Sequence, residues 1–273
     1  MEKELLGDKM RASENIIFED RRTTDRIEII CYSAIGARES QQDAAFAYVD
    51  DERALALVCD GMGGIRGGEA ASRTTVDYMR ERFYEELDGT ADFVENGLQT
   101  LEAVDDVVYQ LRDSAGKRLG CGTTLAAAYL NCGWLYWFSV GDSRIYLMRG
   151  QQMVQATTDH NYHLLLRNQL QAGEISDAEY QKEAPRGEAL ISFIGMGGLM
   201  LIDVNDKGLP LLTGDTVLVC SDGIYRTISN AELCTLLQLS SLEGSAQRMI
   251  EMIEERMSMR QDNFTFVLMR KRK

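Results

Sequence analysis

The stretch Ala54-Leu55-Ala56-Leu57-Val58-Cys59-Asp60-Gly61-Met62-Gly63-Gly64 is an apolar run that stops at a carboxylate and a glycine-rich turn. The apolar residues predict a buried strand, and the glycines let the backbone turn sharply and approach a ligand closely. Asp-Gly after a strand indicates first of all a turn. Taken alone, the stretch has two interpretations: a simple turn, or a strand that delivers Asp60 to a site.

Three further apolar runs carry an aspartate in the same way. The run 216–220 leads into Ser221-Asp222-Gly223, the run 134–140 leads into Gly141-Asp142, and Asp262 stands just before the run 264–269. Strand ends are positions at which a rigid scaffold presents functional side chains. Aspartates at four predicted strand ends favour the second interpretation, in which the strands converge on one site.

Composition narrows the class of protein. The chain has 273 residues, of which 45% are hydrophobic, and this length suits one large domain with a substantial core. Its net charge of -14 argues against nucleic acid and anionic membranes as partners. No apolar run approaches the ~18 residues that a membrane-spanning helix needs, and the first eight residues lack a signal peptide's apolar segment. We therefore expect a cytoplasmic protein.

The order of predicted elements indicates the fold class. Residues 1–25 are charged and nearly patternless, so we interpret them as an N-terminal extension, with regular structure beginning at Arg26 and one domain spanning 26–273. Strands come in consecutive runs and helices in blocks, which favours an α+β fold of antiparallel sheets covered by helices. Helices are predicted over 69–87, 91–117, 160–171, 230–239 and 243–257, with a short one after the capping-box pattern Ser176-Asp177-Ala178-Glu179.

The converging aspartates suit hard divalent cations such as magnesium or manganese, which prefer oxygen ligands. If Asp60 bridged two such ions and Asp222 and Asp262 completed the shell, three negative charges would face four positive ones. The net positive centre would bind an anion, and a water held between the ions would become a nucleophile for attack on phosphorus. Arg38, in the same loop as Asp43, is either a solvated loop residue or a fork that grips phosphate oxygens.

Other chemistries fit less well. A serine hydrolase needs a histidine partner near a Gly-x-Ser-x-Gly elbow, and neither His160 nor His163 is close to one. The stretch 63–68 lacks the lysine of a nucleotide-binding P-loop. The six cysteines form no Cys-x-x-Cys pair, so we interpret them as small buried apolar residues and not as zinc ligands.

In order along the chain, seven motifs resemble the metal-dependent protein phosphatases, the type 2C serine/threonine phosphatases, in their bacterial form. The resemblance covers roughly residues 30–270. The motifs are Arg38 with Gln42-Asp43; Asp60-Gly61-Met62-Gly63-Gly64 with Gly68-Glu69-Ala70-Ala71-Ser72; Gly122-Thr123-Thr124; Gly141-Asp142-Ser143-Arg144; Thr158-Asp159-His160; Ser221-Asp222-Gly223; and Asp262-Asn263-Phe264-Thr265.

The resemblance implies a four-layer sandwich, with two central antiparallel sheets flanked by helix pairs and a flap insert at about 160–189. It implies hydrolysis of phosphoserine and phosphothreonine in proteins by a water activated at two manganese or magnesium ions. By position, Asp60, Asp222 and Asp262 would be catalytic metal ligands and the Gly61 carbonyl a further ligand. Of the remaining site residues, Asp43 would act through water, Asp142 would help to hold a third ion, and Arg38 would bind the substrate phosphate.

Four positions depart from the family pattern: Gln41, where asparagine is usual; Ile65, where histidine is common; Ser192, where arginine stands; and Arg226, where an aspartate is frequent. We expect the positive charge of Arg226 to repel a weakly held cation, so a third ion beside Asp142 should bind weakly or not at all.

The alternative function is a pseudophosphatase or phosphoprotein-binding module. We expect the enzyme to be a monomer. Its expected partners are phosphorylated proteins and a serine/threonine kinase that opposes it.

Overall fold

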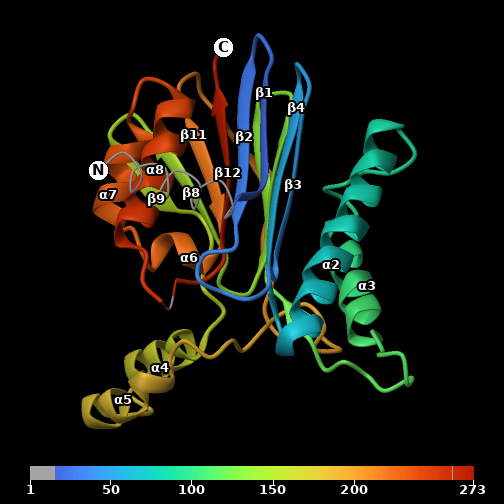
Figure 1. The fold of residues 1–273 in the computed structure, drawn as a ribbon, viewed down its shortest axis with the longest axis vertical. Helices are drawn as coiled ribbons and strands as arrows, with labels where there is room; N and C mark the ends of the chain where they lie inside the picture. Colours follow the sequence, from blue (N-terminus) through green and yellow to red (C-terminus); the bar gives the residue numbers. More distant parts are fainter. Residues whose placement is uncertain (1–15, 260) are drawn as a thin grey trace, which may run out of the picture.

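The computed structural model describes residues 16–259 and 261–273, and in this part of the chain two antiparallel six-stranded sheets pack face to face (Figure 1). The first sheet has the order β1-β2-β12-β11-β8-β9. Its strands are β1 (Ile16–Thr23), β2 (Ile27–Ala34), β12 (Phe264–Lys271), β11 (Thr216–Cys220), β8 (Arg144–Arg149) and β9 (Gln152–Gln155).

The second sheet has the order β10-β7-β6-β4-β3, and the short strand β5 pairs with the end of β4. Its strands are β10 (Asp203–Pro210), β7 (Trp134–Val140), β6 (Leu125–Asn131), β4 (Arg53–Met62), β3 (Asp43–Val49) and β5 (Gly122–Thr123). The apolar run 54–59 belongs to β4, which lies between β6 and β3 and is buried over most of its length.

Helix pairs cover the outer faces of the sheets. In Figure 1, helices α2 (Gly64–Leu87) and α3 (Gly97–Tyr109) stand beside the second sheet, and α7 (Asn230–Leu237) and α8 (Leu242–Arg256) beside the first. The short helix α6 (Asp222–Tyr225) follows β11 directly. With helices outside both sheets, the predicted α+β four-layer sandwich is confirmed.

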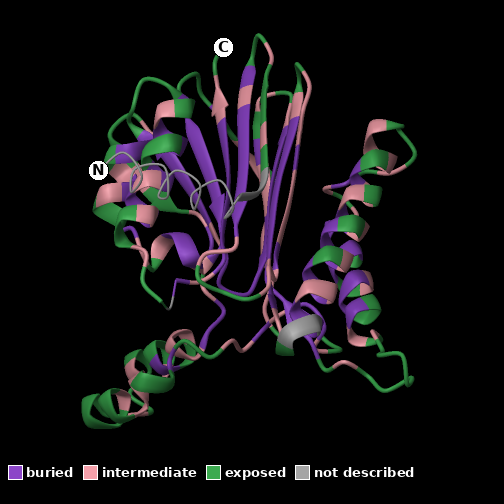
Figure 2. Cartoon of the chain, viewed as in Figure 1, coloured by how far each residue is buried: buried purple, intermediate pink, exposed green. Residues whose placement is uncertain are grey.

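Three apolar clusters separate the four layers. Between the two sheets lie side chains such as Val58 of β4 and Val219 of β11. On the outer face of the first sheet, Phe266 packs with Ile253 of α8, and on that of the second, Leu57 packs with Met79 of α2. Figure 2 shows the result as buried strands lined by half-buried helices. Full burial of one such side chain contributes about 1.5–3 kcal/mol, so the strands are held rigidly in place.

The flap, which we define as residues 160–189, projects from one end of the sandwich (Figure 1). It contains α4 (Tyr162–Gln171), α5 (Asp177–Glu183) and a short 3-10 helix (Ala184–Arg186). The capping box predicted at Ser176 and Glu179 is confirmed, because each side chain bonds to the backbone N–H of the other residue. Most of the flap surface is exposed (Figure 2).

The structure corrects several predicted boundaries. Regular structure does not begin at Arg26, because β1 pairs with β2 along residues 16–23. Its charged side chains conceal an edge strand, which is held by backbone hydrogen bonds and needs less apolar surface than a central strand. Residues 1–15 lie outside the described part of the chain. Strands β9 and β10 were not predicted, since both are short or polar.

Two helices also differ from their predicted ranges. Helix α2 begins at Gly64 and not at residue 69, although glycine is a poor helix former. Helix α3 covers 97–109 and not 91–117, and Leu98 of the predicted apolar stripe is half exposed. Of the six cysteines predicted to be buried, Cys132 is exposed and Cys234 is only half-buried. In the described residues, no helix is both long and apolar enough to cross a bilayer.

Candidate active site

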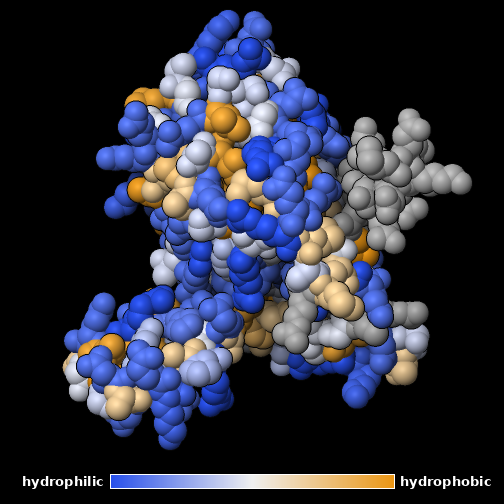
Figure 3. All heavy atoms as spheres, turned by 60° about the vertical axis from the view of Figure 1, so that its left-hand side comes forward, coloured by the Kyte–Doolittle hydropathy of each residue, from blue (hydrophilic) through white to orange (hydrophobic). Residues whose placement is uncertain are grey.

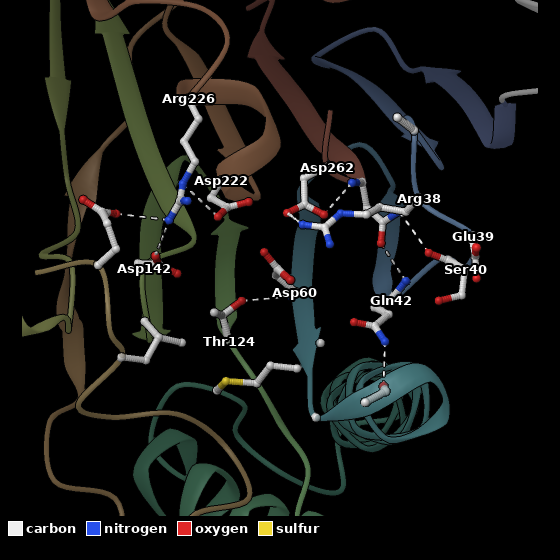
Figure 4. Close-up of a pocket in the computed structure, with 18 residues that line it drawn as sticks. Arg38, Glu39, Ser40, Gln42, Asp60, Thr124, Asp142, Asp222, Arg226 and Asp262 are labelled. Atoms are coloured by element: carbon white, nitrogen blue, oxygen red, sulfur yellow. Dashed lines mark hydrogen bonds and ion pairs between the residues drawn. The ribbon is translucent and has the colours of Figure 1, made fainter. Parts of the chain in front are cut away.

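The predicted aspartates meet at the end of the sandwich nearest the flap. A pocket of about 640 Å³ lies there, and Figure 4 shows Asp60, Asp142, Asp222 and Asp262 around it. They come from β4, from the turn after β7, from the start of α6 and from the residue pair before β12. Asp60 lies within β4, two residues before its end, and not at the end itself.

Neighbouring strands fix the backbone of Asp60. Its N–H donates to Thr124 Oγ1 at 2.9 Å, and its carbonyl accepts from the Thr124 N–H at 2.8 Å and from Thr123 Oγ1 at 2.9 Å. Asp43 lies directly opposite Asp60 in the β3–β4 pair. Because directly opposed residues project to the same face of a sheet, the two carboxylates belong to one group. The role of Thr124 was not predicted, although its Gly-Thr-Thr motif was noted.

Gly61 occupies a position that only glycine fits. A Cβ atom built on it would lie 2.1 Å from the Gly68 carbonyl oxygen and 2.7 Å from that of Gln42. The first turns of α2 and the loop before β3 therefore approach the backbone of β4 directly. This close approach explains the glycine, and it places the Gly61 backbone on the wall of the pocket.

Asp222 and Asp262 are placed by short backbone segments. Asp222 is the first residue of α6, and its Oδ1 atom is buried and has no hydrogen-bond partner in the described residues. Asp262 Oδ1 accepts the N–H of Asn263 at 2.9 Å. Ser221, which precedes Asp222, donates its hydroxyl to Asp43 Oδ2 at 2.8 Å. Ser221 thus links two of the carboxylates, a role that the sequence did not reveal.

The carboxylates have strongly perturbed pKa values. Burial, opposed by the hydroxyls of Ser221 and Thr265, raises the pKa of Asp43 to about 7. Burial and then the charge of Asp222 raise the pKa of Asp142 to about 7. Burial and the charge of Asp43 raise the pKa of Asp60 well above its ordinary value. A buried cluster of like charges is unfavourable unless cations neutralise it, so these shifts indicate a site for positive charge.

Two arginines supply positive charge in this structure. Arg38 Nη2 lies 2.5 Å from Asp262 Oδ2, and Arg226 Nε lies 2.9 Å from Asp222 Oδ2. With the side chains in these positions, no three His, Cys, Asp or Glu residues in 16–259 and 261–273 form a ready-made cage around one ion. The donors nevertheless suit hard cations: they are all oxygens, and Asp222 Oδ1 is buried without a partner. Because magnesium and manganese retain several waters, a site for them needs few protein ligands.

The loop that carries Arg38 is held by Asn263. Its Oδ1 accepts the Gln42 N–H at 2.9 Å, and its Nδ2 donates to the carbonyls of Ile35 at 2.7 Å and Ser40 at 3.1 Å. Asn263, which follows Asp262, therefore ties both sides of the loop to the segment just before β12. The sequence showed Asn263 in a motif without indicating this role.

Three of the residues that depart from the family pattern form hydrogen bonds or ion pairs in the structure: Gln41, Ser192 and Arg226. Gln41 Nε2 donates to Ser33 Oγ at 2.8 Å, and its Oε1 accepts the Asp43 N–H at 3.1 Å. Ser192 Oγ donates to the Leu201 carbonyl at 2.8 Å. Arg226 lies between Asp222 and Asp142 (Figure 4) and also contacts Glu188 of the flap, a pocket residue that no sequence signal indicated. The side chain of Ile65 lies outside the described part.

The fold and the pocket define a family. Residues 31–264 match the family described as Protein phosphatase 2C, and the chain belongs to it. The serine/threonine phosphatase stp of Listeria innocua is 34% identical over 190 residues, which cover 69% of this chain and 73% of that protein. The solved structure of the S. agalactiae serine/threonine phosphatase superimposes with a TM-score of 0.71 and 27% identity, covering 89% of this chain and 99% of that one.

A metal-bound structure shares the same fold. The catalytic domain of serine threonine protein phosphatase PstP in complex with 2 manganese ions superimposes with a TM-score of 0.67. Its identity is 23%, and the match covers 91% of this chain and 99% of that one. The family is metal-dependent, and this chain is a protein serine/threonine phosphatase of the bacterial type 2C class.

Proposed function

We propose that this chain hydrolyses phosphoserine and phosphothreonine in proteins at the pocket between Asp60, Asp222 and Asp262, with two divalent cations held by these carboxylates. The observation that carries the proposal is the convergence of three separate segments, β4, α6 and the residues before β12, on one pocket. One of the three, Asp222, has a buried carboxylate oxygen without a partner in the described residues. Nothing in that part of the chain favours the non-catalytic alternative.

Manganese or magnesium would supply a nucleophilic water and positive charge for the phosphoryl oxygens. The protein's own residues would hold these ions: Asp60, Asp222 and Asp262 through their carboxylates, and Gly61 through its carbonyl. Asp43 would act through water, held in place by the hydroxyl of Ser221. The two manganese ions of the related PstP structure support a pair of ions here.

Arg38 would bind the substrate phosphate. Its side chain is more than half exposed at the pocket mouth, and a guanidinium presents parallel N–H donors that match phosphate oxygens. In this structure Arg38 pairs with Asp262, so it must turn away from that carboxylate when a cation binds there. The loop that Asn263 holds keeps the guanidinium within reach of both positions.

The proposal includes the setting in which the enzyme acts. We place it in the cytoplasm, as a monomer opposed by a serine/threonine kinase. The six cysteines are all free, which suits a reducing compartment. On the face shown in Figure 3, hydrophilic residues dominate and hydrophobic ones form small separate groups, which suits a monomer.

The test is release of phosphate from a phosphothreonine peptide. We expect release to depend on added manganese, to stop when a chelator removes the metal, and to be abolished in Asp60→Asn. Asp206→Asn is a matched control, because Asp206 is exposed on β10 and lines a different pocket. A well-folded protein that binds the phosphopeptide without turnover under excess manganese would favour the binding module.

A further inference from the structure

Arg226 links the flap to the candidate metal centre. It is the residue after α6, four positions beyond Asp222, so its side chain turns back over the start of that one-turn helix. The guanidinium faces three carboxylates: its Nε lies 2.9 Å from Asp222 Oδ2, and its Nη2 lies 3.1 Å from Glu188 Oε2 and 3.9 Å from Asp142 Oδ2. One guanidinium therefore forms ion pairs with two pocket aspartates and with one glutamate of the flap.

Glu188 continues the connection into the flap. Its Oε1 lies 3.5 Å from Nε2 of His163 on α4, while its Oε2 accepts from Arg226. At the same base, the His163 N–H donates to the Gly187 carbonyl at 2.9 Å, and the Tyr162 N–H donates to that of Ala189 at 2.8 Å. In the described residues, the one other side-chain hydrogen bond between the flap and the sandwich is that of His160, whose Nδ1 accepts the Gly141 N–H at 3.2 Å.

The same guanidinium stands where a third cation would need to bind. An ion shared by Asp142 and Asp222 would have to displace it from both, and its positive charge opposes a further cation between these two carboxylates. The residues present therefore do not fit a third ion. They fit an arginine, which unlike an ion is covalently held and directs a second donor toward the flap.

We propose that Arg226 takes the place of a third cation and, through Glu188, holds the flap against the mouth of the phosphate pocket. Arg226 and Glu188 are then positioning residues for protein substrates, which extend from the pocket onto the flap. A small aryl phosphate fills the pocket alone and depends less on this link. The inference rests on the proposed function for its kinetic consequence, whereas the link itself can be measured without catalysis.

The first experiment follows the flap by hydrogen exchange in the full-length protein. Glu188→Ala should make the amides of 161–171 exchange about two- to fivefold faster, the range expected when a half-exposed ion pair is lost. Glu183→Ala is the matched control, because Glu183 pairs with Arg186 within the flap and does not reach the sandwich. Equal exchange in Glu188→Ala and the unmodified protein would overturn the link.

The second experiment counts manganese ions by calorimetry. We expect two ions in the unmodified protein and three in Arg226→Asp, whereas Arg226→Lys should keep two because its charge remains. A third ion in the unmodified protein, or only two ions in Arg226→Asp, would overturn the inference that the Arg226 side chain takes the place of a third cation. The Arg226→Lys variant should also loosen the flap, because one ammonium cannot replace a fork.

The third experiment separates this inference from the proposed function. Glu188→Ala should raise KM for a phosphothreonine peptide several-fold with a smaller change in kcat, and should affect nitrophenyl phosphate less. If the unmodified protein hydrolyses neither substrate while Glu188→Ala still loosens the flap, the link stands and the proposed function fails. If both substrates are hydrolysed and Glu188→Ala changes neither KM nor flap exchange, the link fails and the function stands.

Discussion

Arg38 and Asp262 form an ion pair, with Arg38 Nη2 at 2.5 Å from Asp262 Oδ2, across the mouth of the pocket (Figure 4). The residue proposed to bind phosphate thus lies on a carboxylate proposed to bind metal. Under the proposed assignment, a cation entering this site would compete with Arg38 for Asp262 and release the guanidinium toward the substrate. The proposal therefore predicts that metal loading and phosphate binding are coupled through this pair.

Replacement of Arg38 should separate the two functions. In Arg38→Ala, manganese affinity should hold or increase, because the competitor for Asp262 is gone. Catalytic efficiency toward a phosphopeptide should fall about 10- to 100-fold, since a hydrogen bond between charged groups contributes about 1.5–3 kcal/mol. Calorimetry and steady-state kinetics check the two parts, with Arg38→Lys as the variant that keeps the charge. Unchanged efficiency would return Arg38 to the solvated-loop interpretation.

Neutralising Asp60 should have opposite effects on the metal-free and the metal-bound protein. Burial and the charge of Asp43 raise the pKa of Asp60, so its ionised form destabilises the metal-free fold at neutral pH. Asp60→Asn should therefore raise Tm in chelator, by about 2–4 °C for each kcal/mol gained. It should lower manganese affinity and abolish phosphatase activity, and Asp262→Asn should likewise be inactive. Scanning calorimetry with and without manganese checks the sign, and a lower Tm in chelator would contradict it.

The stability of the metal-free protein should fall as pH rises. Burial raises the folded-state pKa of Asp43 and of Asp142 to about 7, from an ordinary value of 3.8. Between these values the folded protein binds more protons than the unfolded chain, so this contribution is complete below about pH 4 and is lost as pH rises through about 7. In chelator, Tm at pH 8 should lie below Tm at pH 6.

Manganese is the control for this pH effect, because a bound cation stabilises the ionised carboxylates. With saturating manganese, the decline in Tm between pH 6 and pH 8 should shrink or reverse. Asp142→Asn should remove part of the decline in chelator. A Tm that rises with pH in chelator would contradict this prediction. It would show that the ionised carboxylates of Asp43 and Asp142 do not destabilise the metal-free fold.

Asn263 should matter for both stability and substrate binding. In Asn263→Ala, the carbonyls of Ile35 and Ser40 and the N–H of Gln42 lose their partner, at about 1–3 kcal/mol for a buried polar group left unsatisfied. The Arg38 loop should loosen, so KM for a phosphopeptide should rise. Denaturant unfolding measures the first effect and kinetics the second. A loss of stability with unchanged KM would show that the loop does not control Arg38.

Much of the architecture could be predicted from the sequence, because apolar periodicity determines which faces must be buried. The strands around Val58, Val219 and Val267 follow from their apolar runs, and the capping box at Ser176 marks the start of α5. The polar edge strands β1 and β10 could not be predicted in this way. They are held by backbone pairing with β2 and β7, which leaves little trace in side-chain pattern.

The sequence by itself determined the aspartates, the Gly61 turn and the family order of motifs, because these depend on residue type and local spacing. Only the tertiary structure decided which partners these residues have. Ser221 with Asp43, Asn263 with the Arg38 loop, and Arg226 with Glu188 are pairs separated in sequence by 178, 221–228 and 38 positions. Such contacts arise when packed sheets bring distant segments together, and no local pattern specifies which side chains then meet.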